Sequence, residues 1–384
     1  MQTMQKLNRT LLFINLFAIQ AYLIRFEIFT YPTNLQEILI SLNCLTFLST
    51  HKGLPNLKKY WIIWSLIILS GLSIATTDII NQLDLFRHLK FLAFGSALTY
   101  IFCETLNNKN EQEKGIQIAI YGALTFGIFS ALYNLFGFNA AYDHRLLGPL
   151  DAAVYLAFYL APFFIYSTIS AFEQKNRSQI IISTILGALL IATLSMGAIA
   201  GSFICISLYL LNRANKKTKI ILSTIATIIF VSIFYTKILP TIQTEYSSLD
   251  ERGQIWQTSA YLLEKQKNLI TGVGLGQFQE NYAQSVKSVL GKEPLDYFVL
   301  QPHNIFLLFI FNYGILGLSL LLTLIVLNIK SKSIYKYIAF YFLIHGLIDT
   351  PIFKNDILFL FILFNTLSLN PKLNLSKQLP DQKI

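Results

Sequence analysis

Long runs of apolar residues alternate with short polar segments along almost the whole chain. A helix that crosses a membrane needs about 20 mostly apolar residues. Candidate runs cover residues 10–29, 35–50, 60–77, 88–105, 115–136, 148–172, 179–195, 197–212, 218–239, 303–329, 335–350 and 353–370. The pattern therefore predicts an all-α polytopic membrane protein, in which a bundle of about 12 transmembrane helices forms one integral membrane domain over residues 1–384.

One polar stretch, about residues 240–302, is much longer than the other connections. Within it, "RGQIWQTSAYLLEKQ" places apolar residues among polar ones in a pattern that predicts a helix, and "GVGLGQF" and "GKEP" predict turns. We therefore expect one long loop that contains short helices. The polar residues 371–384 are expected to form a tail.

The distribution of charge predicts an orientation. Only 13% of the residues are charged and 54% are hydrophobic, whereas a soluble domain carries about 25% charged residues. If the N-terminus is cytoplasmic, 19 of the 30 lysines and arginines fall in cytoplasmic segments and five in short outer ones. Short loops follow the positive-inside rule, so both termini are expected in the cytoplasm and residues 240–302 outside it.

The net charge of +10 is explained by this one-sided distribution, so no nucleic-acid partner is expected. Cys44, Cys103 and Cys205 all lie in apolar runs, which argues against a disulfide framework or a metal site. The Gly-rich "GVGLGQF" lacks the strand and helix that surround a nucleotide-binding fingerprint. Nucleotide chemistry is therefore not predicted.

Several polar residues are expected at the outer ends of the predicted helices. These residues are Arg145, Arg252, His303, His345, Asp349, Lys354 and Asp356. The planar guanidinium group suits phosphate, and imidazole suits proton transfer near neutral pH. If the helices form a bundle, these side chains can converge on one cavity.

Each residue also has a purely structural interpretation. Arg252 could pair with Asp250 or Glu251 in solvent, and His303 could be an interfacial residue next to Asn304, which could cap the following helix.

Near the last two runs, a packed and hydrogen-bonded His345 is favoured over a catalytic one. Asp349 and Lys354 are expected to neutralise each other. Only the combination of residues therefore favours a site.

Two segments carry a resemblance to a known family. The first is "DERGQIWQTSAYLLEKQKNLITGVGLGQF", followed after about 25 residues by "PHNIFLLFIFNYGILGLSLLLTLIV". Together they resemble the O-antigen ligase and O-antigen polymerase family of bacterial envelope glycosyltransferases. "HRLLGPLDAAVYLAFYLAP" and "HGLIDTPIFKNDILFLFILF" are similar to an earlier and a closing family segment. The resemblance covers roughly residues 115–370.

The resemblance implies an activity. Such enzymes move a glycan from polyprenyl pyrophosphate, such as undecaprenyl pyrophosphate, to a hydroxyl of a lipid or glycan acceptor at the outer face of the bacterial cytoplasmic membrane. It implies that Arg145 and Arg252 bind the pyrophosphate and that His303 is the general base. Residues that could support them are Asn304, His345, Asp349 and Lys354. We expect inversion at the anomeric carbon, no metal and no cofactor, with membrane lipids as surroundings.

One departure from the family pattern concerns Met196. Many members have Ser-Arg-Gly where this chain has "SMG", so a contribution of that arginine to donor binding would be missing here. Ligase and polymerase remain alternatives, with the single outer loop and the His-Asn pair favouring a ligase. A transporter or flippase, or a non-catalytic envelope assembly protein, are alternatives of another class.

Overall fold

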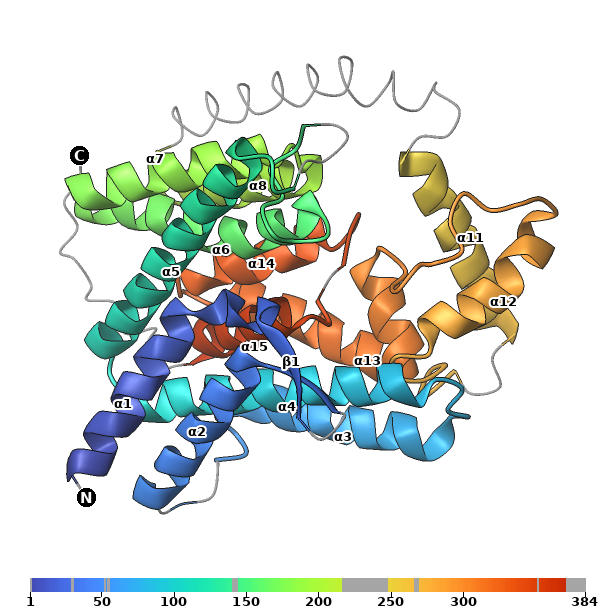
Figure 1. Cartoon of the computed structure of the whole chain (residues 1–384), viewed down its shortest axis with the longest axis horizontal. Helices are drawn as coiled ribbons and strands as arrows, with labels where there is room; N and C mark the ends of the chain where they lie inside the picture. Colours follow the sequence, from blue (N-terminus) through green and yellow to red (C-terminus); the bar gives the residue numbers. More distant parts are fainter. Residues whose placement is uncertain are drawn as a thin grey trace.

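The computed structural model describes residues 2–28, 31–51, 53, 56–139, 144–215, 248–265, 269–350 and 352–370. Most of these residues are helical (Figure 1). The helices of the first two thirds are α1 (Gln2–Phe17), α2 (Leu35–Thr50), α3 (Trp61–Thr76), α4 (Gln82–Thr105), α5 (Lys109–Leu135), α6 (Ala153–Gln174), α7 (Arg177–Ala192) and α8 (Met196–Arg213). The later ones are α11 (Ser248–Lys265), α12 (Phe278–Leu290), α13 (Ile305–Lys330), α14 (Tyr335–His345) and α15 (Asn355–Leu369).

The apolar runs predict the helices well. In the described ranges, every run after the first coincides with a helix to within six residues at either end. The run 218–239 and the tail 371–384 lie outside the described residues. Four helices are long and apolar enough to cross a membrane, namely α5, α6, α8 and α13, and α2, α3, α7 and α15 are apolar but shorter. A bundle of about 12 membrane-spanning helices therefore stays a prediction.

The first run is where the prediction is wrong. Helix α1 ends at Phe17, and a short 3₁₀ helix, η1 (Ile19–Leu23), leads into strands β1 (Arg25–Ile28) and β2 (Tyr31–Asn34), which pair antiparallel. The chain is thus not purely helical. Proline lacks the amide hydrogen that a helix interior requires, so Pro32 suits an edge strand and not a continuous helix.

Asparagine side chains begin many of the helices. The side-chain oxygens of these asparagines accept hydrogen bonds from backbone N–H groups of the first helical turn, as expected for an N-cap. The caps are Asn34 for α2, Asn81 for α4, Asn108 for α5, Asn176 for α7 and Asn304 for α13. These polar residues fix where each apolar segment starts.

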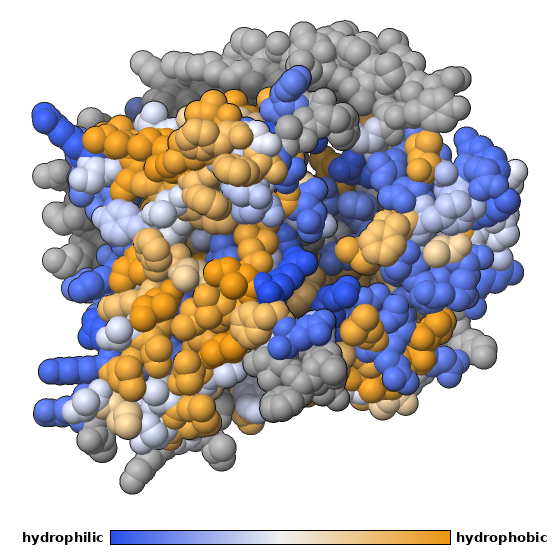
Figure 2. Space-filling view, in the orientation of Figure 1, coloured by the Kyte–Doolittle hydropathy of each residue, from blue (hydrophilic) through white to orange (hydrophobic). Residues whose placement is uncertain are grey.

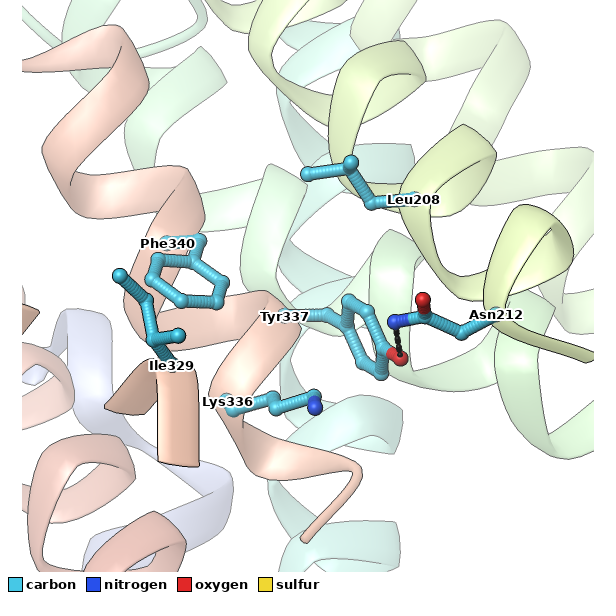
Figure 3. A pocket seen from close by; sticks show the side chains of 6 residues that line it. All are labelled: Leu208, Asn212, Ile329, Lys336, Tyr337 and Phe340. Carbon is cyan, nitrogen blue, oxygen red and sulfur yellow. Dashed lines mark hydrogen bonds between the residues drawn. The ribbon is translucent and has the colours of Figure 1, made fainter. Parts of the chain in front are cut away.

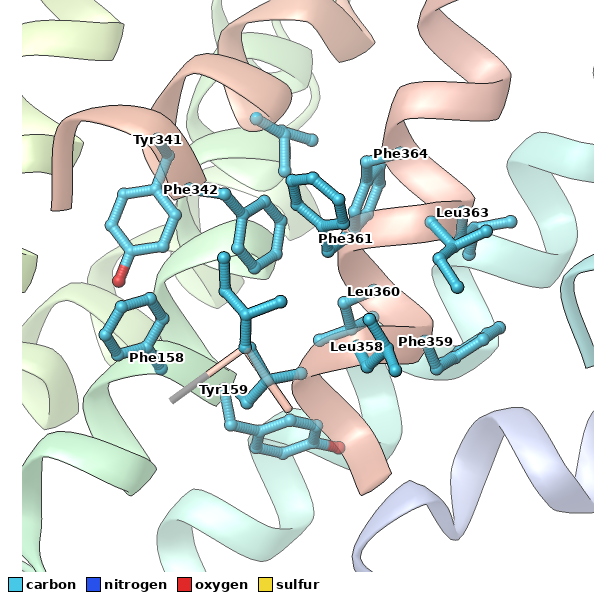
Figure 4. Close-up of a cluster of buried hydrophobic side chains, with 14 of the residues drawn as sticks. Phe158, Tyr159, Tyr341, Phe342, Leu358, Phe359, Leu360, Phe361, Leu363 and Phe364 are labelled. Atoms are coloured by element: carbon cyan, nitrogen blue, oxygen red, sulfur yellow. The ribbon is translucent and has the colours of Figure 1, made fainter. Parts of the chain in front are cut away.

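Helices α6, α14 and α15 form the centre of the bundle. Nearly every residue of α15 is buried, and Figure 4 shows its phenylalanine and leucine side chains packed towards Phe158 and Tyr159 of α6 and towards Tyr341 and Phe342 of α14. The end of α14 and the start of α15 are therefore held rigidly by the core. The described residues between them, 346–350 and 352–354, are therefore anchored to the core at both ends.

The bundle has two distinct ends. Helices α11 and α12 lie at one end, at the right of Figure 1, and α1 begins at the other. We call the first the loop end. At the opposite end, ion pairs join residues of different segments, namely Arg9 with Glu111, Lys59 with Glu104 and Arg213 with Glu173. These pairs place the ends of α4, α6 and α8 and the start of α5 at that end.

A small lobe stands on the loop end. Figure 2 shows hydrophilic residues over α11 and α12 and hydrophobic residues over the helices at the left of the view. The lobe has its own apolar core, made of Ile255, Phe278, Tyr282, Val286, Val299 and Phe311. Because Phe311 belongs to α13, this core joins the lobe to the bundle.

A kink in α13 fixes the lobe further. Gly314 has φ 64° and ψ −153° inside α13, a conformation that essentially only glycine adopts. At the kink, backbone groups of α13 bond to residues 269–273. The N–H of Ile315 donates to the carbonyl of Leu269 at 3.0 Å, and the N–H of Val273 donates to the carbonyl of Phe311 at 2.8 Å. A side chain at Gly314 would put Cβ 2.2 Å from the carbonyl oxygen of Ile270.

Candidate functional site

The start of α13 meets the segment between α14 and α15 at the loop end. The N–H of Ile305 donates to the carbonyl of Gly346 at 2.6 Å. Asn304 caps α13 through its side-chain oxygen and donates from Nδ2 to the carbonyl of Leu347 at 3.1 Å. These backbone contacts hold His303 and Asp349 on adjoining segments.

His303 and Asp349 form the centre of the site. Nδ1 of His303 lies 2.7 Å from Oδ1 of Asp349. An ionised carboxylate can only accept hydrogen bonds, so Nδ1 carries the proton and donates it. The side chain of His303 is 31% exposed and that of Asp349 only 10%. The arrangement leaves Nε2 of an orientated imidazole as the nitrogen that can react.

His303 adopts a left-handed backbone conformation, with φ 48°. Such a conformation is uncommon for a residue with a side chain. It occurs between Pro302 and the cap residue Asn304, where the chain turns into α13. The turn directs the imidazole towards Asp349.

Arg252 reaches the same carboxylate from the lobe. Its Nη2 lies 3.4 Å from Oδ2 of Asp349, and its Nε donates to the carbonyl of Ile348 at 2.8 Å. Its Nη1 donates to the carbonyl of Ser248 at 2.8 Å. Arg252 is therefore bound to the segment before α15 and partly exposed, at 20%.

Trp256 attaches the helix of Arg252 beside His303. One turn after Arg252 in α11, its indole N–H donates to the carbonyl of Pro302 at 3.1 Å. This hydrogen bond involves no charged group, and it fixes α11, which carries Arg252, relative to the residue before His303.

The carboxyl group of Asp349 is ionised. Burial raises its pKa, but the hydrogen bond from His303 and the nearby charge of Arg252 outweigh burial, and the net pKa lies below the usual value. The N–H of Thr350 also donates to Oδ1, at 2.9 Å. Asp349 is thus a buried anion that accepts from three different groups.

The structure corrects the expectation for Asp349 and Lys354. They do not neutralise each other, because the carboxylate of Asp349 binds His303 and Arg252, while Nζ of Lys354 lies 3.7 Å from the ring centre of Tyr155. The sequence analysis treated Asp349 only as a supporting residue. Its central place depends on contacts between segments 46 and 97 residues apart, which no local pattern reveals.

His345 is packed in the core. Its ring stacks on Phe158 with 3.7 Å between ring centres, and Nδ1 lies 2.8 Å from the hydroxyl of Tyr341. Only 1% of the residue is exposed. Gly197, the last residue of "SMG", allows this approach, because a Cβ there would lie 2.8 Å from Cδ2 of His345. A role in support of the site would therefore be indirect.

Arg145 lies at the loop end on a different loop. Its carbonyl accepts from Nδ2 of Asn134 at 3.3 Å, and the next residue, Leu146, donates its N–H to the carbonyl of Ala192 at the end of α7. Arg145 is exposed. Gly197, in the first turn of α8, lies against His345 at the end of α14. Ala192, which Leu146 contacts, precedes Gly197 by five residues, so Arg145 and Asp349 lie at the same end of the bundle.

One cavity lies away from this site. A cavity of about 470 Å³ is lined by Leu208, Asn212, Ile329, Lys336, Tyr337 and Phe340 (Figure 3). Its lining includes Lys336 and Tyr337 in the first turn of α14. The other end of α14 leads to the segment that contacts His303, so the cavity lies at the opposite end of the bundle. In the described part of the chain, no group of three or more His, Cys, Asp or Glu side chains is placed to hold a metal ion.

Comparison with known protein families gives a match that overlaps the site. The sequence model of a family described as O-antigen ligase matches residues 181–322. This match includes Arg252, Trp256 and His303 and lies inside the region of resemblance, residues 115–370. No curated protein matches the sequence. Over residues 181–322 the chain is similar to the O-antigen ligase family, and four of its helices are long and apolar enough to cross a membrane.

Proposed function

We propose that this protein is an O-antigen ligase-like glycosyltransferase that moves a glycan from polyprenyl pyrophosphate to the hydroxyl of an acceptor. The observation that carries the proposal is the junction of His303, Asp349 and Arg252 at the loop end. It joins an accessible imidazole nitrogen to a partly exposed guanidinium group. An imidazole is suited to proton acceptance and a guanidinium group is suited to pyrophosphate binding.

In the proposed reaction, the acceptor oxygen attacks the anomeric carbon of the donor from the face opposite the pyrophosphate. Nε2 of His303 takes the proton of the hydroxyl. The bond between the anomeric carbon and the pyrophosphate oxygen breaks, and polyprenyl pyrophosphate leaves with the electron pair. The configuration at the anomeric carbon is inverted, and no metal is required because cationic side chains stabilise the departing charge.

Each residue of the site has a separate role in this reaction. Asp349 orients His303 through Nδ1, so that Nε2 faces the acceptor. Arg252 and Arg145 bind the pyrophosphate of the donor. Asn304 fixes the start of α13 and thereby the backbone next to the base. His345 supports the segment that carries Asp349 through its buried contacts with Phe158 and Tyr341.

The proposed orientation places the loop end outside the cytoplasmic membrane of a bacterium and both termini inside. A cysteine replacing Ser288, in a background without the three native cysteines, should react with a membrane-impermeant thiol reagent in cells with a permeabilised outer membrane. A cysteine replacing Lys332, at the opposite end, should react only after lysis. The reverse pattern would contradict the orientation.

The acceptor decides between a ligase and a polymerase. A ligase transfers finished glycan to a lipid or another carrier, whereas a polymerase transfers it to a second lipid-linked glycan. We propose a ligase, because the chain has one outer stretch of moderate length and the His303–Asn304 pair. Deletion should remove all long glycan from the acceptor while lipid-linked polymer accumulates. Single repeat units on the acceptor would indicate a polymerase instead.

A further inference from the structure

A second cavity lies at the end of the bundle opposite His303. It has a volume of about 290 Å³ and is enclosed by the turn before α3, the first turn of α3 and the end of α15. Lys59, whose ion pair with Glu104 lies at this end, belongs to that turn. Sites for small molecules commonly have volumes of about 300–1,000 Å³. The size of the cavity therefore suits a small ligand or the headgroup of a lipid.

The cavity is positively charged. Lys58 and Lys59 both line it. Glu104 faces the same turn from α4, where its Oε1 lies 2.7 Å from Nζ of Lys59 and its Oε2 lies 3.8 Å from Nε2 of His51. Lys58 is exposed, and within the described part of the chain it forms no ion pair. Since Lys59 matches the charge of Glu104, the cavity keeps the charge of Lys58.

Thr366 of α15 gives the cavity a buried hydroxyl. This residue lines the cavity and is only 4% exposed, and its Oγ1 has no hydrogen-bond partner among the described residues. A threonine in a helix can donate to the carbonyl four residues earlier, as Thr168 does to Phe164 at 2.7 Å. Native proteins rarely leave a buried hydroxyl unpaired. The hydroxyl of Thr366 is therefore suited to a ligand in the cavity.

An exposed apolar face of α3 leads away from the cavity. Trp61, which lines the cavity, is followed seven and eleven residues later by Ile68 and Leu72, and this spacing places the three on one side of a helix. Ile68 is 58% exposed and Leu72 is 40% exposed. Tryptophan is typical of the interface between membrane and water. A cationic cavity is thus continuous with an apolar strip that runs along α3.

We propose that this cavity binds the phosphate of an anionic phospholipid from the membrane leaflet at the end opposite His303. The ammonium group of Lys58 pairs with the phosphate, the hydroxyl of Thr366 donates to a phosphate oxygen, and the acyl chains lie along the exposed face of α3. In the proposed orientation this is the cytoplasmic leaflet, where basic pockets between membrane helices bind anionic headgroups. The inference does not depend on the proposed glycosyl transfer.

Charge and apolar surface favour a phospholipid over two other occupants. Residues 371–384 follow Asn370, which lines the cavity, and they contain three lysines and one aspartate. Their charge does not complement a cationic cavity. A soluble phosphate ester would use the same polar groups but would leave the apolar face of α3 uncovered. The headgroup and the acyl chains of a phospholipid match both features.

The test measures binding of three probes to the full chain in micelles of a neutral detergent. The probes are short-chain phosphatidylglycerol, short-chain phosphatidylcholine and glycerol 3-phosphate, and the first should bind most tightly. In Lys58→Gln the dissociation constant for phosphatidylglycerol should rise roughly ten- to a hundredfold, as expected for losing one hydrogen bond to a charged group. Lys114→Gln, which removes an exposed lysine of α5 at the same end, should behave as the wild type.

Thr366→Val separates binding from stability. Valine has nearly the shape of threonine, and burial of an unpaired hydroxyl is unfavourable. Without lipid, the thermal transition of Thr366→Val should therefore equal or exceed that of the wild type. A ligand that binds the folded state raises the transition, and phosphatidylglycerol should raise it less in Thr366→Val than in the wild type.

Four results would overturn the proposal. They are an equal effect of phosphatidylglycerol on the thermal transitions of wild type and Thr366→Val, an unchanged affinity in Lys58→Gln, equal affinities for phosphatidylglycerol and phosphatidylcholine, and no binding of either lipid. Binding of glycerol 3-phosphate as tight as that of phosphatidylglycerol would assign the cavity to a soluble anion and would also overturn it.

Discussion

His303 and Asp349 are 46 residues apart in the chain, yet Nδ1 of the imidazole lies 2.7 Å from a carboxylate oxygen. The contact joins the start of α13 to the connection between α14 and α15. The core of α14 and α15 fixes one partner, and the cap of α13 fixes the other. An imidazole held in this way has one free nitrogen, with its tautomer set by the carboxylate.

Asp349→Asn should reduce transfer strongly. The carboxylate accepts from His303, Thr350 and Arg252, and an amide must turn its NH₂ group towards at least one of these donors. If it faces His303, the proton moves to Nε2 and the base is blocked. General base catalysis contributes about 10²–10⁴-fold, so we expect a loss in this range in single-turnover transfer.

Donor binding by Asp349→Asn provides the control, because the arginines remain. If donor binding falls as much as transfer does, Asp349 acts through Arg252 and not through His303. Asp151→Asn changes an acidic residue of the same end that does not contact His303, and it should retain most transfer.

Arg252→Lys should be more damaging than its unchanged charge suggests. Lysine keeps the positive charge but cannot reach Asp349, Ile348 and Ser248 at once with a planar set of donors. Loss of one hydrogen bond to a charged group costs roughly 1.5–3 kcal/mol, which predicts a fall in transfer of roughly ten- to a hundredfold. Wild-type transfer by Arg252→Lys would make this residue a structural ion pair only. Arg213→Lys, at the opposite end, is the matched control.

Trp256→Phe should weaken the attachment of α11 to the segment before His303. The change keeps an aromatic ring and removes one hydrogen bond, to the carbonyl of Pro302. A stability loss of about 1 kcal/mol is expected, together with reduced transfer because Arg252 and His303 lose a shared constraint. Tyr282→Phe removes a hydrogen bond to the carbonyl of Asp296 in the same lobe. It should cost similar stability but leave transfer intact; equal losses of transfer would refute the positioning role.

Gly314→Ala should detach the lobe from α13. The backbone conformation there costs a residue with a side chain about 1–3 kcal/mol, and its Cβ would clash with the carbonyl of Ile270. Faster proteolysis within residues 269–302 and a lower thermal transition are expected. Gly71→Ala, in α3 where a Cβ meets nothing within 4 Å, should leave both unchanged or improve them. Equal behaviour of the two variants would contradict the docking described for the lobe.

The apolar pattern is sufficient to predict the apolar helices of the described ranges, because each is long, and asparagines such as Asn81 and Asn304 cap several of them. It fails at residues 25–34, where a charged and proline-containing segment follows an apolar run and turns into a hairpin. The pattern also predicts that Arg252 and His303 share an end of the bundle. It cannot predict that Asp349 joins them, since pairing across the fold depends on tertiary packing and not on local periodicity.

The central claim is that His303 is the base. Single-turnover transfer and donor binding should be measured in parallel for His303→Ala, with Asn304→Ala as the variant that removes the helix cap beside it and with His345→Ala as the second histidine of the region. The account predicts that His303→Ala loses transfer by about 10²–10⁴-fold while binding donor as the wild type does, and that Asn304→Ala loses less. Near-normal transfer by His303→Ala, with transfer abolished in His345→Ala, would contradict it.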